Sequence, residues 1–200
     1  NLRVPMVSND PADFFDTASA SYSSRLYSTE LNLKRQWSEW LKLLAGFRCV
    51  ELHEQISAEA YSPGLEGNFD IGSSNYLYGF QMGAESILYE HGPLRFDGYL
   101  KAGVYGNHIR GSIRGEGTYY HEDSSGSTSR TSFLGEAGLT ASYQLCNHCV
   151  LYGGYQVMWV EGVALAGDFA SSIVEPLADY NAIDGTAFYH GAQAGLQFSW

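Results

Sequence analysis

Apolar and polar residues alternate with a period of two along most of this 200-residue chain. Residues on one side of a β-strand recur at every second position, so this alternation predicts strands that bury one face. The clearest case is the C-terminal segment, whose apolar face is formed by Phe188, His190, Ala192, Ala194, Leu196, Phe198 and Trp200. Its other face carries only Tyr, Gly, Gln and Ser.

The same period predicts seven strands, and together they cover most of the chain. Their ranges are 27–34, 41–48, 76–88, 94–105, 131–145, 150–166 and 188–200. Glycine and tyrosine are abundant, at 23 and 15 residues, which fits strands joined by turns. The chain is therefore predicted to be all-β.

The predicted connections alternate between short and long. Residues 36–40, 90–93 and 146–149 are short connections, whereas residues 62–75, 117–129 and 167–185 are long ones. Transmembrane β-barrels have short periplasmic turns and long external loops, and a soluble sandwich has no reason to sort its loops in this way. We therefore predict an antiparallel up-and-down transmembrane β-barrel with seven strands visible. The complete protein should have eight or more, because bacterial barrels have an even strand count.

Charged residues recur on the polar face of these strands, and their signs nearly balance. They are Glu30, Lys34, Lys42, Arg48, Glu85, Arg95, Asp97, Lys101 and Glu136. In a membrane barrel these side chains would line a hydrated lumen, whereas in a soluble barrel they would form the solvated outer face. The alternation alone does not decide which face is inside.

The last strand ends on an aromatic residue. Trp200 is preceded at alternate positions by Phe198 and Leu196. This pattern resembles the C-terminal signal that the barrel assembly machinery recognises in bacterial outer-membrane proteins. It would place this end of the strand, and the short turns, on the periplasmic side.

Composition narrows the function classes. The formal net charge is −11 and only three residues are lysine, so a nucleic-acid partner is not expected. No segment has the nearly continuous apolar character of a membrane-spanning helix. The six histidines form neither a close pair nor an HExxH motif, and Gly-x-Ser-x-Gly does not occur. We expect neither an enzyme nor a metal site or cofactor.

Three phrases resemble the outer-membrane β-barrel porin family of bacteria with Gram-negative-type envelopes. They are residues 44–54, which contain LAGFR and ELHE, residues 75–83 (NYLYGFQMG) and residues 154–166 (GYQVMWVEGVALA). The resemblance spans about residues 22–200. It implies a barrel fold, a location in the cell outer membrane, and outer-membrane lipid and the barrel assembly machinery as partners.

Residues 22–200 are accordingly predicted to form the barrel domain. Residues 1–21 would be an N-terminal segment, either an extracellular loop or the remnant of an upstream strand. Family members are longer and seven is an odd number, so we expect an upstream strand to be missing or poorly formed.

Cys146 and Cys149 flank a predicted two-residue turn. Cysteines in directly opposed positions lie about 5.5 Å apart at Cα, within reach of a disulfide. A structural disulfide, unpaired thiols and a small metal site remain alternatives, although no second cluster would complete a zinc site. The lone Cys49 stands on the apolar face and is expected to be a small apolar residue.

Two functions follow from the predicted barrel. The first is a narrow porin or a structural envelope protein, because seven or eight strands enclose little more than side chains. The second is a surface protein that binds or adheres to an external partner, of unknown identity, through long loops rich in acidic residues. A soluble ligand-binding barrel is the third reading. The acidic residues of the predicted loops are Glu59, Glu66, Asp70, Glu116, Glu122, Asp123, Asp168, Glu175, Asp179 and Asp184.

Overall fold

A computed structural model gives the structure of this protein and describes residues 2–6, 17–63, 65–118, 120–172 and 185–199. The described residues form one antiparallel sheet and one short helix, α1 (Ala166–Ser172). The strands are β1 (Leu2–Met6), β2 (Thr17–Ser38), β3 (Leu41–Ser62), β4 (Leu65–His91), β5 (Leu94–Gly117), β6 (Tyr120–Cys146), β7 (Cys149–Val163) and β8 (Gly185–Phe198).

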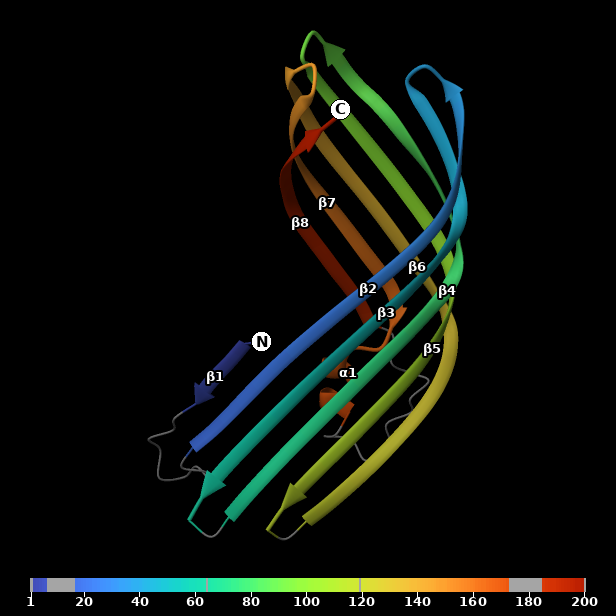
Figure 1. Cartoon of the computed structure of the whole chain (residues 1–200). Helices are drawn as coiled ribbons and strands as arrows, with labels where there is room; N and C mark the ends of the chain where they lie inside the picture. Colours follow the sequence, from blue (N-terminus) through green and yellow to red (C-terminus); the bar gives the residue numbers. More distant parts are fainter. Residues whose placement is uncertain (1, 7–16, 64, 119, 173–184, 200) are drawn as a thin grey trace.

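Each strand pairs with the next in sequence, so the sheet has the simple order β1 to β8 (Figure 1). The prediction of an all-β, antiparallel up-and-down fold is confirmed. The sheet curls into a half-barrel, because among the described residues β8 pairs only with β7, and β2 beyond Tyr22 pairs only with β3.

The direction of the strands explains why this half-barrel is open. β2 and β8 run the same way, so an antiparallel ladder cannot join them directly. The short β1 runs opposite to β2 and pairs with residues 18–22, where a strand antiparallel to both edges would start to close the barrel. The described sheet has eight strands, and the closed barrel stays a prediction.

Two of the three predicted long loops are wrong. β3 ends at Ser62 and β4 begins at Leu65, while β5 ends at Gly117 and β6 begins at Tyr120. The strands β2 to β6 are 22 to 27 residues long. A strand needs only about 9–11 residues to cross a bilayer. These strands therefore extend far beyond the length that a membrane can cover, and the predicted loops 62–75 and 117–129 consist mainly of the first parts of β4 and β6.

The reason is that the outer face of each long strand changes from apolar to polar, and in β3 the inner face also changes in the opposite sense. From Leu41 to Cys49 the outward positions are apolar, and the inward positions include Lys42 and Arg48. From Val50 onward the inward positions are Val50, Leu52, Glu54 and Ile56, and the outward ones are Glu51, His53, Gln55 and Ser57. We call the first part, where apolar residues face outward, the belt half, and the remainder the projecting half.

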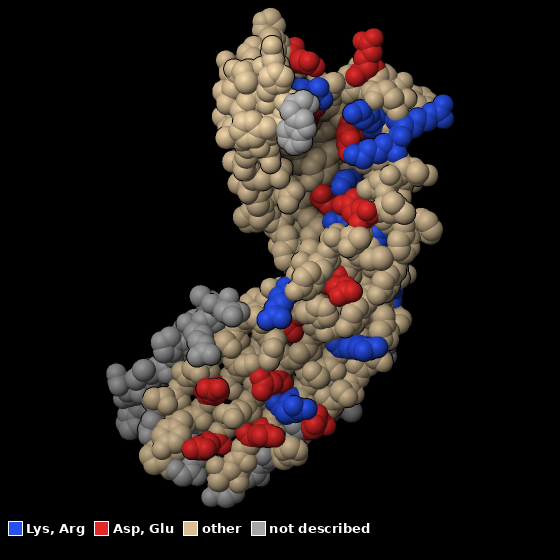
Figure 2. Space-filling view, in the orientation of Figure 1, with Lys and Arg blue, Asp and Glu red and all other residues tan. Residues whose placement is uncertain are grey.

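The belt half exposes large apolar side chains on its outer face. Leu31 is 78% exposed, Leu33 84% and Phe80 76%. Figure 2 shows the outer surface of β7 and β8, at the upper left, without charged side chains, while acidic and basic residues follow the hollow beside it. Monomeric soluble proteins seldom leave a continuous apolar surface of this kind uncovered. No helix in the described part of the chain is long and apolar enough to cross a membrane.

Candidate functional site

Four charged side chains meet inside the belt half, where they form a closed network that we call the charged layer. Arg48 Nη1 lies 2.6 Å from Glu136 Oε2 and 3.7 Å from Glu30 Oε1. Lys101 Nζ lies 3.0 Å from Glu30 Oε1 and 3.7 Å from Glu136 Oε1. The four residues come from β2, β3, β5 and β6, so the network crosses the hollow of the sheet.

Neutral groups complete the charged layer. Arg48 Nε donates to Ser28 Oγ at 2.9 Å, and Tyr99 OH donates to Glu136 Oε1 at 2.8 Å. Gln81 Nε2 donates to Glu30 Oε2 at 2.7 Å. Arg48 is only 3% exposed. Two acids face two bases, so these buried charges compensate one another, which a buried charge requires.

The other predicted lumen charges lie toward the turns and are more exposed. Lys34 pairs with Glu85, with side chains 51% and 30% exposed. Arg95 Nη2 lies 2.6 Å from Asp97 Oδ1. Lys42 stands opposite Glu85 in the ladder between β3 and β4. All nine predicted residues therefore lie on the inward face, but only four of them join the charged layer.

An apolar layer fills the interior on the projecting side of the charged layer. Its buried residues are Val50, Leu52, Leu77, Tyr105, Leu134, Val160, Val163 and Ala187. Leu26 of β2 and Tyr189 of β8 pack against it, so the layer reaches from one edge of the half-barrel to the other. Side chains fill this part of the interior.

The chain after β7 then turns inward and covers the apolar layer. Ala164 O accepts hydrogen bonds from Ser73 Oγ at 2.6 Å and from Asn75 Nδ2 at 2.8 Å, and Ala164 N donates to Asn75 Oδ1 at 2.9 Å. Gly162 O accepts from Ser132 Oγ at 2.6 Å and from Asn107 Nδ2 at 3.1 Å. We call residues 162–169 the inward segment. Its backbone groups are bonded by side chains of the strands, as buried backbone groups must be.

Two further features fix the inward segment. Gly162 has φ +77°, a conformation that favours glycine, and a Cβ there would approach Thr131 O to 2.8 Å. Glu54 Oε2 accepts from Ala166 N at 3.0 Å. Phe169 of α1 is buried against Ile71 and Ile109, and α1 lies behind the lower part of β3 to β5 in Figure 1.

The residues that hold the inward segment were not among the predicted site residues. Most of them stand beside other small or polar residues, and Ser73 and Asn75 fall in the predicted loop 62–75, so the alternation gives them no weight. The five residues are Glu54, Ser73, Asn75, Asn107 and Ser132. The family resemblance does contain a signal for the inward segment. Glu54, Asn75 and the stretch from Gly162 to Ala166 belong to the three phrases that carry the family resemblance, and the structure brings all three together.

The predicted assembly signal is described in part. Leu196 and Phe198 face outward and are 53% and 62% exposed, whereas Trp200 lies outside the described residues.

Cys146 stands opposite Cys149 in the ladder, and both are free thiols in the structure, as is Cys49 on the outer face. The disulfide remains a prediction.

The acidic residues do not form external loops as predicted. Glu59, Glu66, Asp70, Glu116, Glu122 and Asp123 belong to strands of the projecting half, and Asp168 belongs to α1. Glu175, Asp179 and Asp184 lie outside the described residues. In the described part of the chain no group of three or more His, Cys, Asp or Glu residues is placed to hold a metal ion.

No protein-family model matches the sequence, and no curated protein matches it. Among solved structures, the chain is similar to the crystal structure of Neisserial surface protein A, with 16% sequence identity over 90% of this chain and 99% of that chain. The TM-score is 0.27. The resemblance to the porin family is thus not shown by any family model. Location and function are inferred below from the geometry of this chain.

Proposed function

We propose that this chain forms an outer-membrane β-barrel whose interior is filled by side chains, and whose role is to hold the projecting half above the bilayer as a structural or binding surface. The observation that carries this proposal is the reversal of polarity at Cys49 and Val50. An apolar outer face fits contact with lipid, and a polar outer face fits contact with water.

The length of the belt supports the same reading. Along β3 the apolar outward positions run from Leu41 to Cys49, which is nine residues. This agrees with the about 9–11 residues of a tilted transmembrane strand. Aromatic residues lie near both limits of the belt: Trp37, Trp40 and Tyr89 at the turns, and Tyr27, Tyr78 and Trp159 toward the projecting half. Such aromatic girdles are typical of the two membrane interfaces.

The filled interior favours a structural or binding role over a narrow porin. A solute would have to pass the charged layer, the apolar layer and the inward segment in turn. We expect the purified full chain in a planar lipid bilayer to give no channel steps under conditions where an open porin conducts. Regular channel steps would overturn the filled interior and restore the porin hypothesis.

The membrane position is tested by a matched pair of cysteines on β4. In a background with Cys49→Ala, Cys146→Ser and Cys149→Ser, Met82→Cys places a thiol on the belt and Asn68→Cys places one on the projecting half. After reconstitution into lipid vesicles, a membrane-impermeant maleimide should label Asn68→Cys and spare Met82→Cys. Equal labelling of both, together with extraction without detergent, would indicate a soluble barrel instead.

A further inference from the structure

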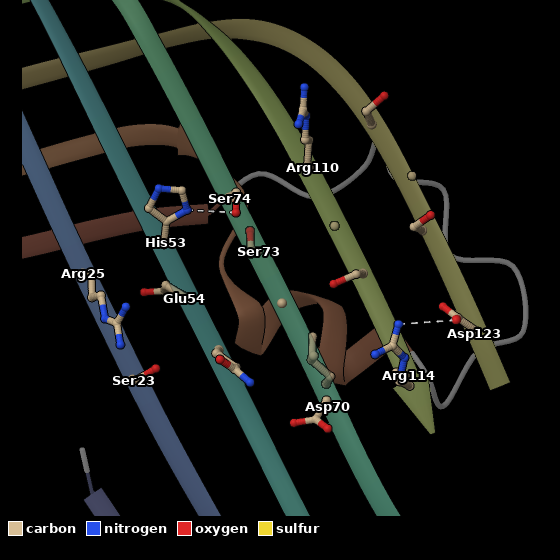
Figure 3. A pocket seen from close by; sticks show the side chains of 18 of the residues that line it. Ser23, Arg25, His53, Glu54, Asp70, Ser73, Ser74, Arg110, Arg114 and Asp123 are labelled. Atoms are coloured by element: carbon tan, nitrogen blue, oxygen red, sulfur yellow. Dashed lines mark hydrogen bonds and ion pairs between the residues drawn. The ribbon is translucent and has the colours of Figure 1, made fainter. Parts of the chain in front are cut away.

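A polar groove of about 950 Å³ lies on the outer face of the projecting half, across β2 to β6. It occupies the side of the sheet opposite α1, which is visible behind the strands in Figure 3. Small residues form its floor, so the sheet is hollowed there. Among them are Gly72, Ser74, Ser112, Ser125 and Ser127.

One row of the sheet brings cationic side chains to this groove. The ladders pair Arg25 with His53, His53 with Ser74, and Ser74 with Arg110, so these four residues lie side by side on four neighbouring strands (Figure 3). Tyr27 and Tyr76 occupy the next row toward the belt, and the Arg110 guanidinium lies over the Tyr76 ring at 5.7 Å. The row of Arg25, His53, Ser74 and Arg110 therefore lies just outside the belt, on the side of the projecting half.

These two arginines lack the compensation found inside the barrel. Every base of the charged layer has a carboxylate partner, and Arg114 at the far side of the groove lies 3.5 Å from Asp123. In the described part of the chain, no carboxylate oxygen lies within 4.0 Å of the guanidinium of Arg25 or Arg110. In a protein of net charge −11, two uncompensated guanidinium groups beside one groove point to an anionic ligand.

We propose that this groove binds the phosphorylated sugar headgroup of a glycolipid in the outer leaflet. This inference rests on the proposed membrane position, which puts the groove at the level of the headgroups. Guanidinium groups bind phosphate with paired hydrogen bonds, and the serine hydroxyls of the floor and His53 can bond sugar hydroxyls.

The width of the groove favours a sugar over a single phosphate. Arg25 and Arg110 are three strand spacings apart, or about 14 Å between Cα atoms at ~4.8 Å a strand. One phosphate cannot fill that distance, whereas a phosphorylated saccharide can contact both ends and the floor between them.

The groove is suited to binding rather than to hydrolysis. His53 Nδ1 lies 3.0 Å from Ser74 Oγ, and His53 Nε2 lies 3.6 Å from Glu51 Oε2, which are residue types used in nucleophilic catalysis. However, Ser74 lies within a regular strand with ladders on both sides. Its neighbouring N–H groups are committed to those ladders and are not free to stabilise an oxyanion.

The test uses the full chain in neutral detergent micelles, with folding verified for every variant by heat-modifiable gel mobility. Dissociation constants are measured for diphosphorylated lipid A, for the same lipid A with its phosphates removed, and for inorganic phosphate. The variants are R25Q/R110Q in the groove and R35Q as the control. Arg35 is an exposed, outward-facing arginine of the same strand, β2, but lies at the opposite end from the groove.

We expect the wild type to bind diphosphorylated lipid A more tightly than the dephosphorylated form, and more weakly as salt is added. R25Q/R110Q should lose about tenfold in affinity for each guanidinium removed, while R35Q should match the wild type. Equal binding by R25Q/R110Q and the wild type, or no preference for the phosphorylated lipid, would overturn the proposal. If inorganic phosphate displaced diphosphorylated lipid A at an equal concentration, the groove would be a site for free phosphate instead. The maleimide labelling in vesicles tests the membrane position, and the affinity measurements test the groove. Either experiment can fail without the other, so the two proposals are tested separately.

Discussion

The belt half and the projecting half are built from the same strands with opposite polarity. In the belt half, Phe47 and Phe80 face outward and Arg48 faces inward. In the projecting half, Leu52 faces inward and His53 faces outward. β3 alternates in both halves, but the phase of its alternation changes once, between residues 49 and 50.

This difference teaches that the period of a strand and its phase carry separate information. The period shows that a segment is a strand with two unlike faces. The phase shows which solvent each face meets, once the inside of the barrel is known. A change of phase within one unbroken strand marks the level at which the surroundings change, and the predictions below test that level from both sides.

The largest effect should come from breaking the charged layer. Arg48→Ala leaves the two carboxylates of Glu136 and Glu30 facing Lys101 alone in the charged layer, so one buried negative charge is uncompensated and we expect a loss of about 3–5 kcal/mol in the free energy of unfolding. The control is Lys34→Ala, which breaks the exposed pair with Glu85 and should cost no more than about 1 kcal/mol. Urea unfolding in lipid vesicles measures both, and equal losses would show that the layer is not buried in the folded barrel.

The next effect contrasts the two outer faces. Met82→Arg puts a charge among the lipid-facing residues of β4 and should cost about 2–4 kcal/mol in vesicles. Asn68→Arg puts the same charge on the projecting half of the same strand, opposite Glu59 and Glu116, and should change stability by no more than about 0.5 kcal/mol. If Met82→Arg were equally harmless, the belt would not face lipid.

A smaller effect concerns the inward segment. Asn75→Ala removes the side chain that bonds both Ala164 N and Ala164 O, and should cost about 1–3 kcal/mol because the buried Ala164 N loses its acceptor, while Ala164 O keeps only the bond from Ser73 Oγ. Amide hydrogen exchange should rise first in residues 162–169. Ser74→Ala, the neighbouring residue on the outer face, is the control and should leave exchange in that segment unchanged. Faster exchange in both variants would argue against a specific role for Asn75.

The smallest effect is a pH dependence in the projecting half. Burial and the hydrogen bond that Tyr22 OH donates to Glu54 Oε1, at 2.6 Å, raise the pKa of Tyr22 from 10.0 to about 12. The neutral phenol is therefore favoured in the folded state, and its stabilising contribution is complete below pH 10 and lost as the pH rises toward 12. The difference in unfolding free energy between the wild type and Tyr22→Phe should stay constant below pH 10 and shrink above it. A difference that grows above pH 10 would reverse the sign of this linkage.

Much of the fold could be predicted from the sequence, because the belt half displays its alternation strongly. Pairs such as Leu31 with Leu33 and Phe80 with Met82 define the outward face without ambiguity. The projecting half was missed because its outward positions are mostly small or polar, as in residues 123–129, and such composition is also typical of loops.

The candidate site was predictable in kind but not in detail. Alternation placed Arg48, Lys101, Glu30 and Glu136 on one face, yet which of them meet depends on the stagger between β2, β3, β5 and β6. Stagger follows from the position and length of each turn, and the predicted long loops 62–75 and 117–129 misplace two of the turns. The inward segment could not be predicted from local pattern either, because Asn75 bonds to Ala164, which lies 89 positions further along the chain.

The inward segment also has a consequence for the order of folding. Its bonds join residues 89 positions apart, from Asn75 to Ala164, and 112 positions apart, from Glu54 to Ala166. Contacts between such distant residues form late, since the entropy of closing a long loop must be overcome first. The inward segment therefore settles only after β3 and β4 have paired and have placed Glu54 and Asn75 on the same inner face. The wall formed by β3 to β5 thus serves as a template for the inward segment, whereas β8 forms its ladder with β7.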